Sequence, residues 1–408
     1  MTISERLGAR LLDLERLLQC VASCSVIRYG VHLSTVNSDG IVCPPTYAAP
    51  KKGDPPYLPF RRAYIDGQQR EIVVLDSPQS QSNRVELALL DAVRNRRIAY
   101  PNIEISFPAD LCEPVYSVLQ LSHRVYDAVL RACNFDGTPF FATSVGQSLL
   151  DARVADATAL FVHAPATLVL GAWDSNGGGG PQSAKFPRLM TSEIVGLDAQ
   201  RAELSATKFD PMDIRRNVAE MVATGDRIRR FELRNPAAKG SKKEVGKPSD
   251  YGFGSVPATA VARGAVINGA LQTSVVSCSG LRQLGFPAAD NTRNEERDQA
   301  GRAVLAALAL FGLIAQNEAG YLLRSRCELL PQDAGKLELI GRTLQEIEVS
   351  ALDTEAARRL LADACENARQ HGLAFRPELL KLDADDRLIE LVRRSRDAAP
   401  TADADVDG

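Results

Sequence analysis

The stretch from Arg227 to Lys247 carries residues that can neutralise a polyanion. It holds eight basic and two acidic residues, a local charge of +6 in a chain whose formal net charge is −3. Each Lys or Arg placed on a phosphate releases condensed counterions, so such a segment favours a nucleic-acid partner. A solvated surface loop is the alternative interpretation. The candidate phosphate contacts in this stretch are Arg229, Arg230, Arg234, Lys239, Lys242, Lys243 and Lys247.

A group of polar side chains follows a short apolar run. Residues 77–84 (SPQSQSNR) come directly after EIVVLD at residues 71–76, and six of the eight are small hydroxyl or amide residues. Such side chains on a loop held by a buried strand can donate to phosphate and ribose oxygens. The same residues can instead begin a helix, with Ser82 or Asn83 as its N-cap. The donors predicted to contact a ligand are Ser77, Gln81, Asn83 and Arg84.

The run Gly177–Gly180 resembles a phosphate-binding loop only in its glycines. A triphosphate-binding loop needs G-x-x-x-x-G-K-[ST], whereas Lys185 here lies between Ala184 and Phe186. What remains is either a hairpin tip or a loop that lets the backbone approach a ligand. Further candidate phosphate contacts are Lys185 and Arg188, which follow the loop, and Arg263 and Arg282, which flank a long predicted strand.

Patterns for catalysis or metal binding are weak. The four histidines at positions 32, 123, 163 and 371 are far apart, and none lies beside a Ser or Cys nucleophile in a known arrangement. A histidine acting as general base in RNA cleavage is the catalytic alternative. The eight cysteines form no C-x-x-C pair and are typical of free thiols in a reducing cytoplasm. We therefore predict no catalytic residue, no metal site and no cofactor.

Composition is that of an ordinary soluble globular protein. The chain has 408 residues, of which 45% are hydrophobic and 24% charged. A pI near 6.0 argues against a wholly basic nucleic-acid coat, so any such binding must be local. The longest apolar run, Ala303–Ala315, is 13 residues, too short to span a bilayer. We expect a cytoplasmic protein with no membrane contact.

The predicted elements mix strands and helices without a strict alternation. Strands are expected at residues 25–36, 71–76, 103–107, 262–279 and 321–330, with two more in 157–173 joined at Ala164–Pro165. Helices are expected at 1–19, 85–96, 116–133, 298–317, 352–371 and 386–396, the fifth capped by Asp353 or Thr354. No dinucleotide-binding fingerprint follows a strand. An α+β fold is therefore predicted.

Four segments together resemble one protein family. They are LDSPQSQSNRVE (75–86), LSHRVYDAVLR (121–131), LGAWDSNGGGG with KFPRLMTSEIVG (170–196), and KPSDYGFGSVP (247–257). This combination is similar to the CRISPR-associated RAMP proteins of the GSU type, which form the repeated backbone subunit of the type I-U (I-G) Cascade complex. The resemblance runs from about residue 20 to about residue 330.

The resemblance implies a modified RRM or ferredoxin-like core with large insertions and a helical C-terminal region. The expected organisation is a core over residues 1–330 with a basic thumb-like segment at about 225–260, a helical extension over 331–396 and a disordered acidic tail over 397–408. Copies would polymerise along the guide RNA (crRNA), support target DNA pairing, and contact other Cascade subunits.

Backbone subunits of this kind are not enzymes, so the protein is expected to hold RNA without cutting it. An aromatic pattern of the usual RRM kind is missing, which agrees with a protein that reads the RNA backbone and not its sequence. Two alternatives stay open. One is a RAMP endoribonuclease that processes precursor crRNA, and the other is a protein-interaction scaffold with an incidental basic loop.

Overall fold

The computed structural model describes residues 10–48, 57–111, 115–174, 185–215, 217–224, 230–234, 245–376 and 378–397. Its main element is a nine-stranded sheet in the order β18-β19-β1-β17-β11-β4-β3, in which β20 also pairs with β1 and β21 pairs with β20. All these pairs are antiparallel. The strands are β1 (Val26–Thr35), β3 (Phe60–Ile65), β4 (Gln68–Asp76), β11 (Met190–Leu197), β17 (Ala270–Ser277), β18 (Tyr321–Arg324), β19 (Cys327–Pro331), β20 (Lys336–Ile340) and β21 (Ile347–Ser350).

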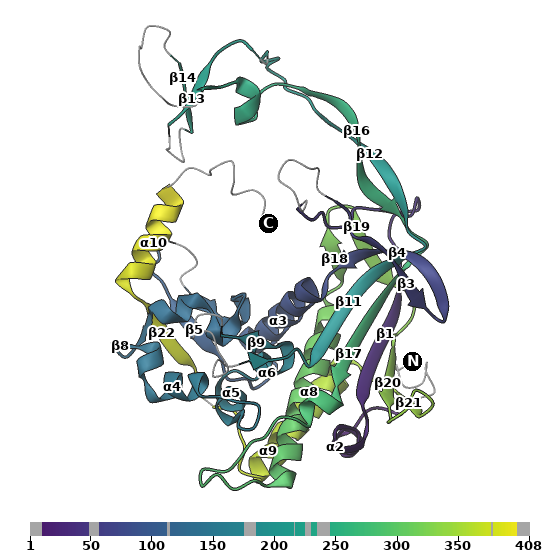
Figure 1. Ribbon diagram of the computed structural model, residues 1–408, viewed down its shortest axis with the longest axis vertical. Helices are drawn as coiled ribbons and strands as arrows, with labels where there is room; N and C mark the ends of the chain where they lie inside the picture. Colours follow the sequence, from purple (N-terminus) through teal and green to yellow (C-terminus); the bar gives the residue numbers. More distant parts are fainter. Residues whose placement is uncertain are drawn as a thin grey trace.

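Helices cover one face of this sheet, as Figure 1 shows. The strands β1 and β17 alternate buried and partly exposed residues, so that one face of each faces the core. The long helix α8 (Glu295–Glu318) lies at the centre and packs against α2 (Leu14–Ser23), α3 (Pro78–Arg94) and α9 (Thr354–Gln370). By length and composition α8 could cross a membrane, but 89% of its most apolar window is buried in the fold. It is the core helix of this layer.

Two helices, α3 and α8, alternate in the chain with four neighbouring strands of the main sheet. In chain order, β1, α3, β11, β17, α8 and β20 run strand–helix–strand–strand–helix–strand. In space the four strands lie side by side as β20, β1, β17 and β11, all antiparallel. The hairpin β3–β4 comes before α3 in the chain, and β4 extends the sheet beyond β11. The predicted α+β class is confirmed.

A smaller five-stranded sheet lies beside the main one. Its order is β6-β5-β22-β7-β8, and β22 runs parallel to β5. Its strands are β5 (Ile103–Ser106), β6 (Val115–Ser117), β7 (Cys133–Phe135), β8 (Thr138–Pro139) and β22 (Leu380–Ala384), followed by α10 (Asp386–Asp397). The region 331–396 was expected to be a helical extension. It contains α9 and α10, but its strands β20 and β22 pair with strands from early in the chain, so it is integral to both sheets.

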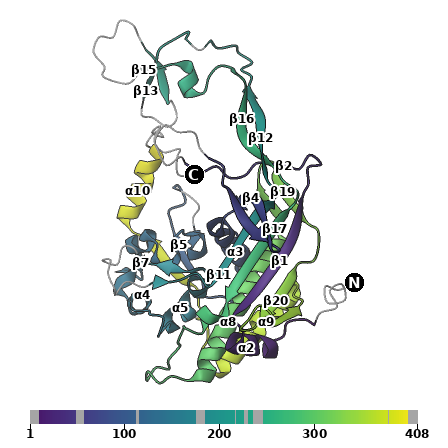
Figure 2. The same cartoon turned by 45° about the vertical axis from the view of Figure 1, so that its right-hand side comes forward.

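A long arm, residues 200–266, projects from the body in both ribbon views (Figures 1 and 2). Its two sides are β12 (Gln200–Lys208) and β16 (Val256–Val266), and β2 (Ile41–Val42) pairs with the base of β16. At its far end lie a 3-10 helix, η5 (Pro248–Tyr251), and a small sheet of β13 (Met221–Ala223), β14 (Phe231–Leu233) and β15 (Val245–Gly246). The described residues of the expected thumb-like segment at 225–260, which are 230–234 and 245–260, lie in the outer part of this arm.

Several predicted elements are different in the structure. Residues 157–173 form two buried helices, α5 (Thr158–His163) and α6 (Pro165–Leu170), because Pro165 occupies the first turn of a helix, where its missing N–H costs nothing. Residues 116–133 form β6 and three short 3-10 helices, η1 (Val118–Gln120), η2 (Arg124–Tyr126) and η3 (Ala128–Ala132), in place of one helix. The expected strand at 262–279 is the end of β16, a turn at Gly269 (φ 99°), and β17. The remaining elements are η4 (Phe140–Ala142), α4 (Ser144–Leu150), α7 (Cys278–Leu281), β9 (Ala172–Trp173) and β10 (Lys185–Phe186).

Candidate nucleic-acid interface

A pocket of about 450 Å³ lies between the start of α3 and the short strands β9 and β10. We call it the Trp173 pocket. Its polar and aromatic lining comes from four separate chain segments, namely Gln79 and Asn83 of α3, Ser122, His123 and Arg124 of the turn before η2, Gly171 and Trp173 around β9, and Phe186 and Arg188 around β10. It brings together two of the predicted contacts, Asn83 and Arg188, with a third, Lys185, next to it.

The pairing of β9 with β10 fixes one wall of the pocket. Lys185 pairs with Trp173, and Phe186 pairs with Ala172. Gly171 precedes this pair with φ 79°, and a Cβ atom placed there would lie 2.8 Å from the backbone nitrogen of Arg188. A glycine at this position therefore allows the two backbones to approach and sets the position of Arg188.

The floor of the pocket is a buried ion pair. Arg124 donates from Nε and Nη2 to the two carboxylate oxygens of Glu86, at 2.6 and 3.1 Å, and from Nη1 to the carbonyl of Gly171 at 2.8 Å. Both side chains are nearly inaccessible to solvent. Burial raises the pKa of Glu86 to about 7, against the opposing charges of Arg124 and Arg188. Arg124 is thus held in place by Glu86 and Gly171 and is not free to bind a ligand.

Arg188 is the cation at this site without an acceptor. Within the described residues it makes no hydrogen bond or ion pair, although it lies near the Arg124–Glu86 pair. Partial burial, followed by the charge of Arg124, lowers the pKa of Arg188. The side chain of Arg188 is exposed, so its guanidinium can donate to the oxygens of an anion that a ligand supplies.

An exposed aromatic ring lies at the edge of the same pocket. Trp173, the chain's single tryptophan, is 54% exposed, and Nζ of Lys185 lies 5.3 Å from its ring centroid. Sequence reasoning did not select Trp173, Gln79 or Arg124. The sequence feature that could have pointed to Trp173 is a lone tryptophan shortly before a glycine-rich run, in the same segment as Lys185 and Arg188.

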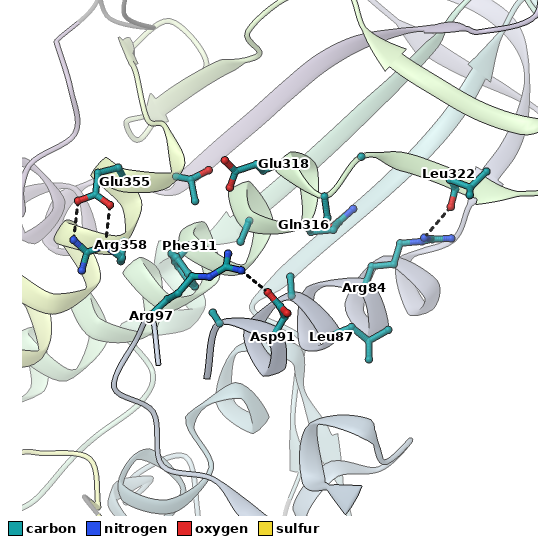
Figure 3. A pocket seen from close by; sticks show the side chains of 16 residues that line it. Arg84, Leu87, Asp91, Arg97, Phe311, Gln316, Glu318, Leu322, Glu355 and Arg358 are labelled. Carbon is teal, nitrogen blue, oxygen red and sulfur yellow. Dashed lines mark hydrogen bonds and ion pairs between the residues drawn. The ribbon is translucent and has the colours of Figure 1, made fainter. Parts of the chain in front are cut away.

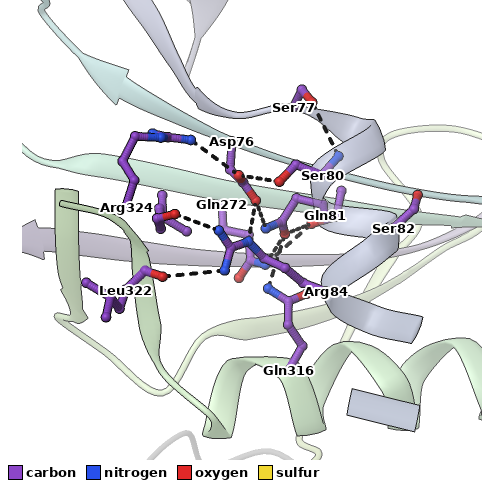
Figure 4. Close-up of polar contacts among 12 residues, drawn as sticks. Asp76, Ser77, Ser80, Gln81, Ser82, Arg84, Gln272, Gln316, Leu322 and Arg324 are labelled. Atoms are coloured by element: carbon purple, nitrogen blue, oxygen red, sulfur yellow. Dashed lines mark hydrogen bonds and ion pairs between the residues drawn. The ribbon is translucent and has the colours of Figure 1, made fainter. Parts of the chain in front are cut away.

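Most of the predicted donors after β4 have structural roles (Figure 4). Ser77 is the N-cap of α3, where its hydroxyl accepts from the backbone N–H of Ser80 at 3.3 Å. Gln81 is fully buried and therefore cannot contact RNA. Its Nε2 donates to Asp76 at 2.6 Å, and its Oε1 accepts hydrogen bonds from Ser192, Gln272 and Gln316.

Arg84 is likewise occupied within the fold. It pairs with the buried carboxylate of Asp76 at 3.0 Å and donates to the carbonyl of Leu323 at 2.9 Å. Of the four predicted donors, Asn83 is the exposed one that faces the Trp173 pocket. The helix begins at Pro78, several residues before the caps expected at Ser82 or Asn83.

The predicted cations of the arm are only partly described. Arg230, Lys247 and Arg263 are exposed, and Arg234 pairs with Glu220 at 2.7 Å. Arg229, Lys239, Lys242 and Lys243 lie outside the described residues. Arg282 belongs to the body, where Nη1 donates to the carbonyls of Val21 and Cys24 at 2.7 Å each and so satisfies the C-terminal end of α2. Its role is to hold that helix, which does not fit the predicted RNA contact.

A larger pocket of about 570 Å³ lies along α3, α8 and α9 (Figure 3). Its walls include the apolar side chains of Leu87, Phe311 and Leu322. The arginines around it already have partners, because Arg97 donates to Asp91 at 3.0 Å and Arg358 to Glu355 at 2.7 Å. Its positive charges are therefore compensated, and it suits an anionic ligand less well than the Trp173 pocket does.

Within the described residues, no group of three or more His, Cys, Asp or Glu side chains could hold a metal ion. His163 is partly buried with Nδ1 unpaired, and burial lowers its pKa to about 4. His123 is exposed and lines the Trp173 pocket.

Comparison with known proteins agrees with the resemblance seen in the sequence. A crystal structure of Csc2 from Thermofilum pendens aligns with 90% of this chain and 86% of that chain, at 11% identity and a TM-score of 0.30, which is too low to carry an inference. A search of curated proteins gave no match. Residues 27–201, which include β1, α3 and the whole Trp173 pocket, match the family model described as CRISPR-associated protein GSU0053. This match covers 175 of the 408 residues and, together with the four motifs, shows that the chain is similar to CRISPR-associated proteins of this family.

Proposed function

We propose that this chain is a non-catalytic, guide-RNA-binding backbone subunit of a CRISPR type I surveillance complex. The observation that carries the proposal is the arm, which projects from a CRISPR-associated body and presents the exposed cations Arg230, Lys247 and Arg263. Cations spread along a projecting hairpin suit a phosphate backbone better than a compact ligand.

The Trp173 pocket adds a second RNA-binding surface on the body, at Asn83, Lys185 and Arg188. Between them, the arm and the pocket would hold the crRNA while the target DNA strand pairs with it. Neighbouring copies of the chain would continue the track along the guide, and other Cascade subunits would bind at its ends. We place this complex in the cytoplasm.

The test is the salt dependence of RNA binding. Substituting Arg230, Lys247 and Arg263 by Ala should weaken binding of unrelated RNA sequences about equally. It should also reduce the slope of log affinity against log salt by about 0.7 for each phosphate that the variant no longer neutralises. The matched control is a variant in which Arg358, Arg369 and Arg387 are replaced by Ala. This variant removes the same charge from the body, and each of the three arginines pairs with an acidic neighbour in the fold. Equal slopes for the two triple variants would remove the arm from the RNA interface.

An RNA-cleaving enzyme is the rival hypothesis, and exposed His123 in the Trp173 pocket is its best-placed acid–base candidate. Labelled repeat RNA should stay intact with the wild-type protein, in the presence and in the absence of divalent metal. Specific cleavage that His123→Ala abolishes would replace the non-catalytic proposal. A protein scaffold, the other rival, would purify without nucleic acid and show no RNA affinity in the same titrations.

A further inference from the structure

We propose that the Trp173 pocket holds one unstacked nucleotide of a bound RNA strand, with its base against the ring of Trp173 and its phosphate at Arg188. This inference rests on the proposed function and adds to it a defined site for a single nucleotide on the body of the protein. It predicts that RNA is held at one point by stacking as well as by charge.

The base end of the pocket is aromatic and open. Trp173 leaves more than half of its surface exposed although it is the largest side chain at the site. Exposing so much aromatic surface costs free energy in water, and a nucleobase has a flat π-face that can cover it without regard to base identity. Lys185, near the same ring, adds positive charge beside the stacking surface.

The phosphate end is cationic and has unused donors. Arg188 has no acceptor within the described residues, and Asn83 and Gln79 line the same pocket with amide groups. The buried Arg124 beneath is paired with Glu86, so Arg188 is the cation that is free to bind. One guanidinium with two nearby amides matches a phosphodiester and the ribose attached to it.

The size and position of the pocket favour a nucleotide over a lone anion. Its volume of about 450 Å³ lies in the range of roughly 300–1,000 Å³ that small-molecule sites occupy. A simple anion would leave most of it, including the tryptophan ring, uncovered. A base that leaves the stack of a single strand supplies both the missing anion and the missing apolar cover.

The single tryptophan makes the inference directly measurable. With the full-length protein freed of nucleic acid at high salt, a labelled RNA of random sequence is titrated while RNA polarisation and Trp173 fluorescence are recorded together. The two signals should saturate at the same RNA concentration. Trp173→Ala should weaken RNA affinity at least about fivefold, since base–aromatic stacking contributes about 1–3 kcal/mol.

Substitutions at the phosphate end complete the test. Arg188→Ala should weaken binding about tenfold, as expected when a charge-assisted hydrogen bond is removed, and Arg188→Lys should recover part of the affinity. Arg94→Ala is the matched control, because Arg94 is exposed at the opposite end of α3 and should leave affinity almost unchanged. The thermal midpoints of all variants should remain close to that of the wild type, which separates weaker binding from a damaged fold.

The outcomes also separate this inference from the proposed function. RNA binding seen by polarisation, with Trp173 fluorescence and the affinity of Trp173→Ala both unchanged, would overturn the nucleotide pocket and leave the RNA-binding subunit intact. Absence of any RNA binding would overturn both. Quenching by inorganic phosphate as strong as that by adenosine 5′-monophosphate would reduce the site to a simple anion site and contradict the stacking.

Discussion

Gln81 connects three elements of the fold through one side chain. It links Asp76 at the end of β4 with Gln272 on β17 (Figure 4) and with Ser192 on β11. The hydroxyl of Tyr321 donates to Gln272 at 3.1 Å. Each of these groups is buried and polar, so its hydrogen bonds must be satisfied inside the protein. The network orients the start of α3, and Asn83, one turn further along the helix, lines the Trp173 pocket.

We expect Gln81→Ala to lower the free energy of unfolding by at least about 2 kcal/mol, because Asp76 and Ser192 lose buried partners. Asn83→Ala is the matched control on the same helix. Its exposed side chain makes no hydrogen bond within the described residues, so the change should stay within about 0.5 kcal/mol. Urea denaturation followed by circular dichroism measures both. Equal stability of the two variants would contradict the structural role of Gln81.

His163 should make stability depend on pH. Its folded pKa is about 4, lowered by burial and then by the charge of Arg376, from an ordinary value of 6.5. Between these values the unfolded chain binds more protons than the folded one, so stability decreases as the pH falls through this window. The wild type should lose up to about 3 kcal/mol relative to His163→Gln between pH 6.5 and pH 4.

Denaturant unfolding of the two proteins at several pH values gives this difference directly. Other groups titrate in the same range, but they do so in both proteins and cancel. A difference in the free energy of unfolding between wild type and His163→Gln that stayed constant from pH 6.5 to pH 4 would mean that His163 is solvated in the folded state. It would contradict the burial of this side chain.

The arm is an element that the body does not need for its own packing. The hydrophobic core includes Ala265 and Ile267 at the base of the arm, and its other members come from the body. The ladder begins with Gln200 opposite Val266 and Ala202 opposite Gly264, so a short hairpin can close just beyond these pairs. Asn-Gly is a favoured two-residue turn for such a closure.

We predict that replacing residues 204–262 by Asn-Gly leaves the body folded and removes most of the RNA affinity. The thermal midpoint should remain close to that of the full chain, while the slope of log affinity against log salt becomes shallower. Scanning calorimetry and salt-dependent RNA titrations provide the two measurements. Quenching of Trp173 by a short RNA should survive, because the pocket belongs to the body. An armless chain that binds RNA as tightly as the wild type would contradict the proposed role of the arm.

The whole molecule is asymmetric, with the arm extending from one end of the body (Figure 2). A subunit that contacts its neighbours through two different surfaces forms an open array when no rotation closes it. In the proposed function, RNA sets the length of that array. We therefore expect the purified chain to form particles whose mass increases stepwise with RNA length, measured by light scattering or mass photometry. A closed dimer of fixed mass, unaffected by RNA length, would oppose this assembly.

The sequence by itself determined the elements whose signal is local. The strand predicted at 25–36 is β1, and the helix predicted at 352–371 is α9 with Asp353 as its N-cap. Both follow from side-chain periodicity and capping chemistry, which do not depend on distant residues. The motifs shared with the family could also be recognised from the sequence, because they are short runs of specific residues.

Only the tertiary structure decided which polar residues are available to a ligand. Ser77, Gln81 and Arg84 look like donors in the sequence, but the fold turns them inward onto a buried carboxylate and a helix end. Residues 157–173 carry no helical periodicity because α5 and α6 are each only six residues long and α6 is buried on every side. The Trp173 pocket forms where Asn83, Arg124, Trp173 and Arg188 meet, from segments 15 to 105 positions apart in the sequence. Which distant residues come together is decided by long-range packing, and a local sequence pattern does not show it.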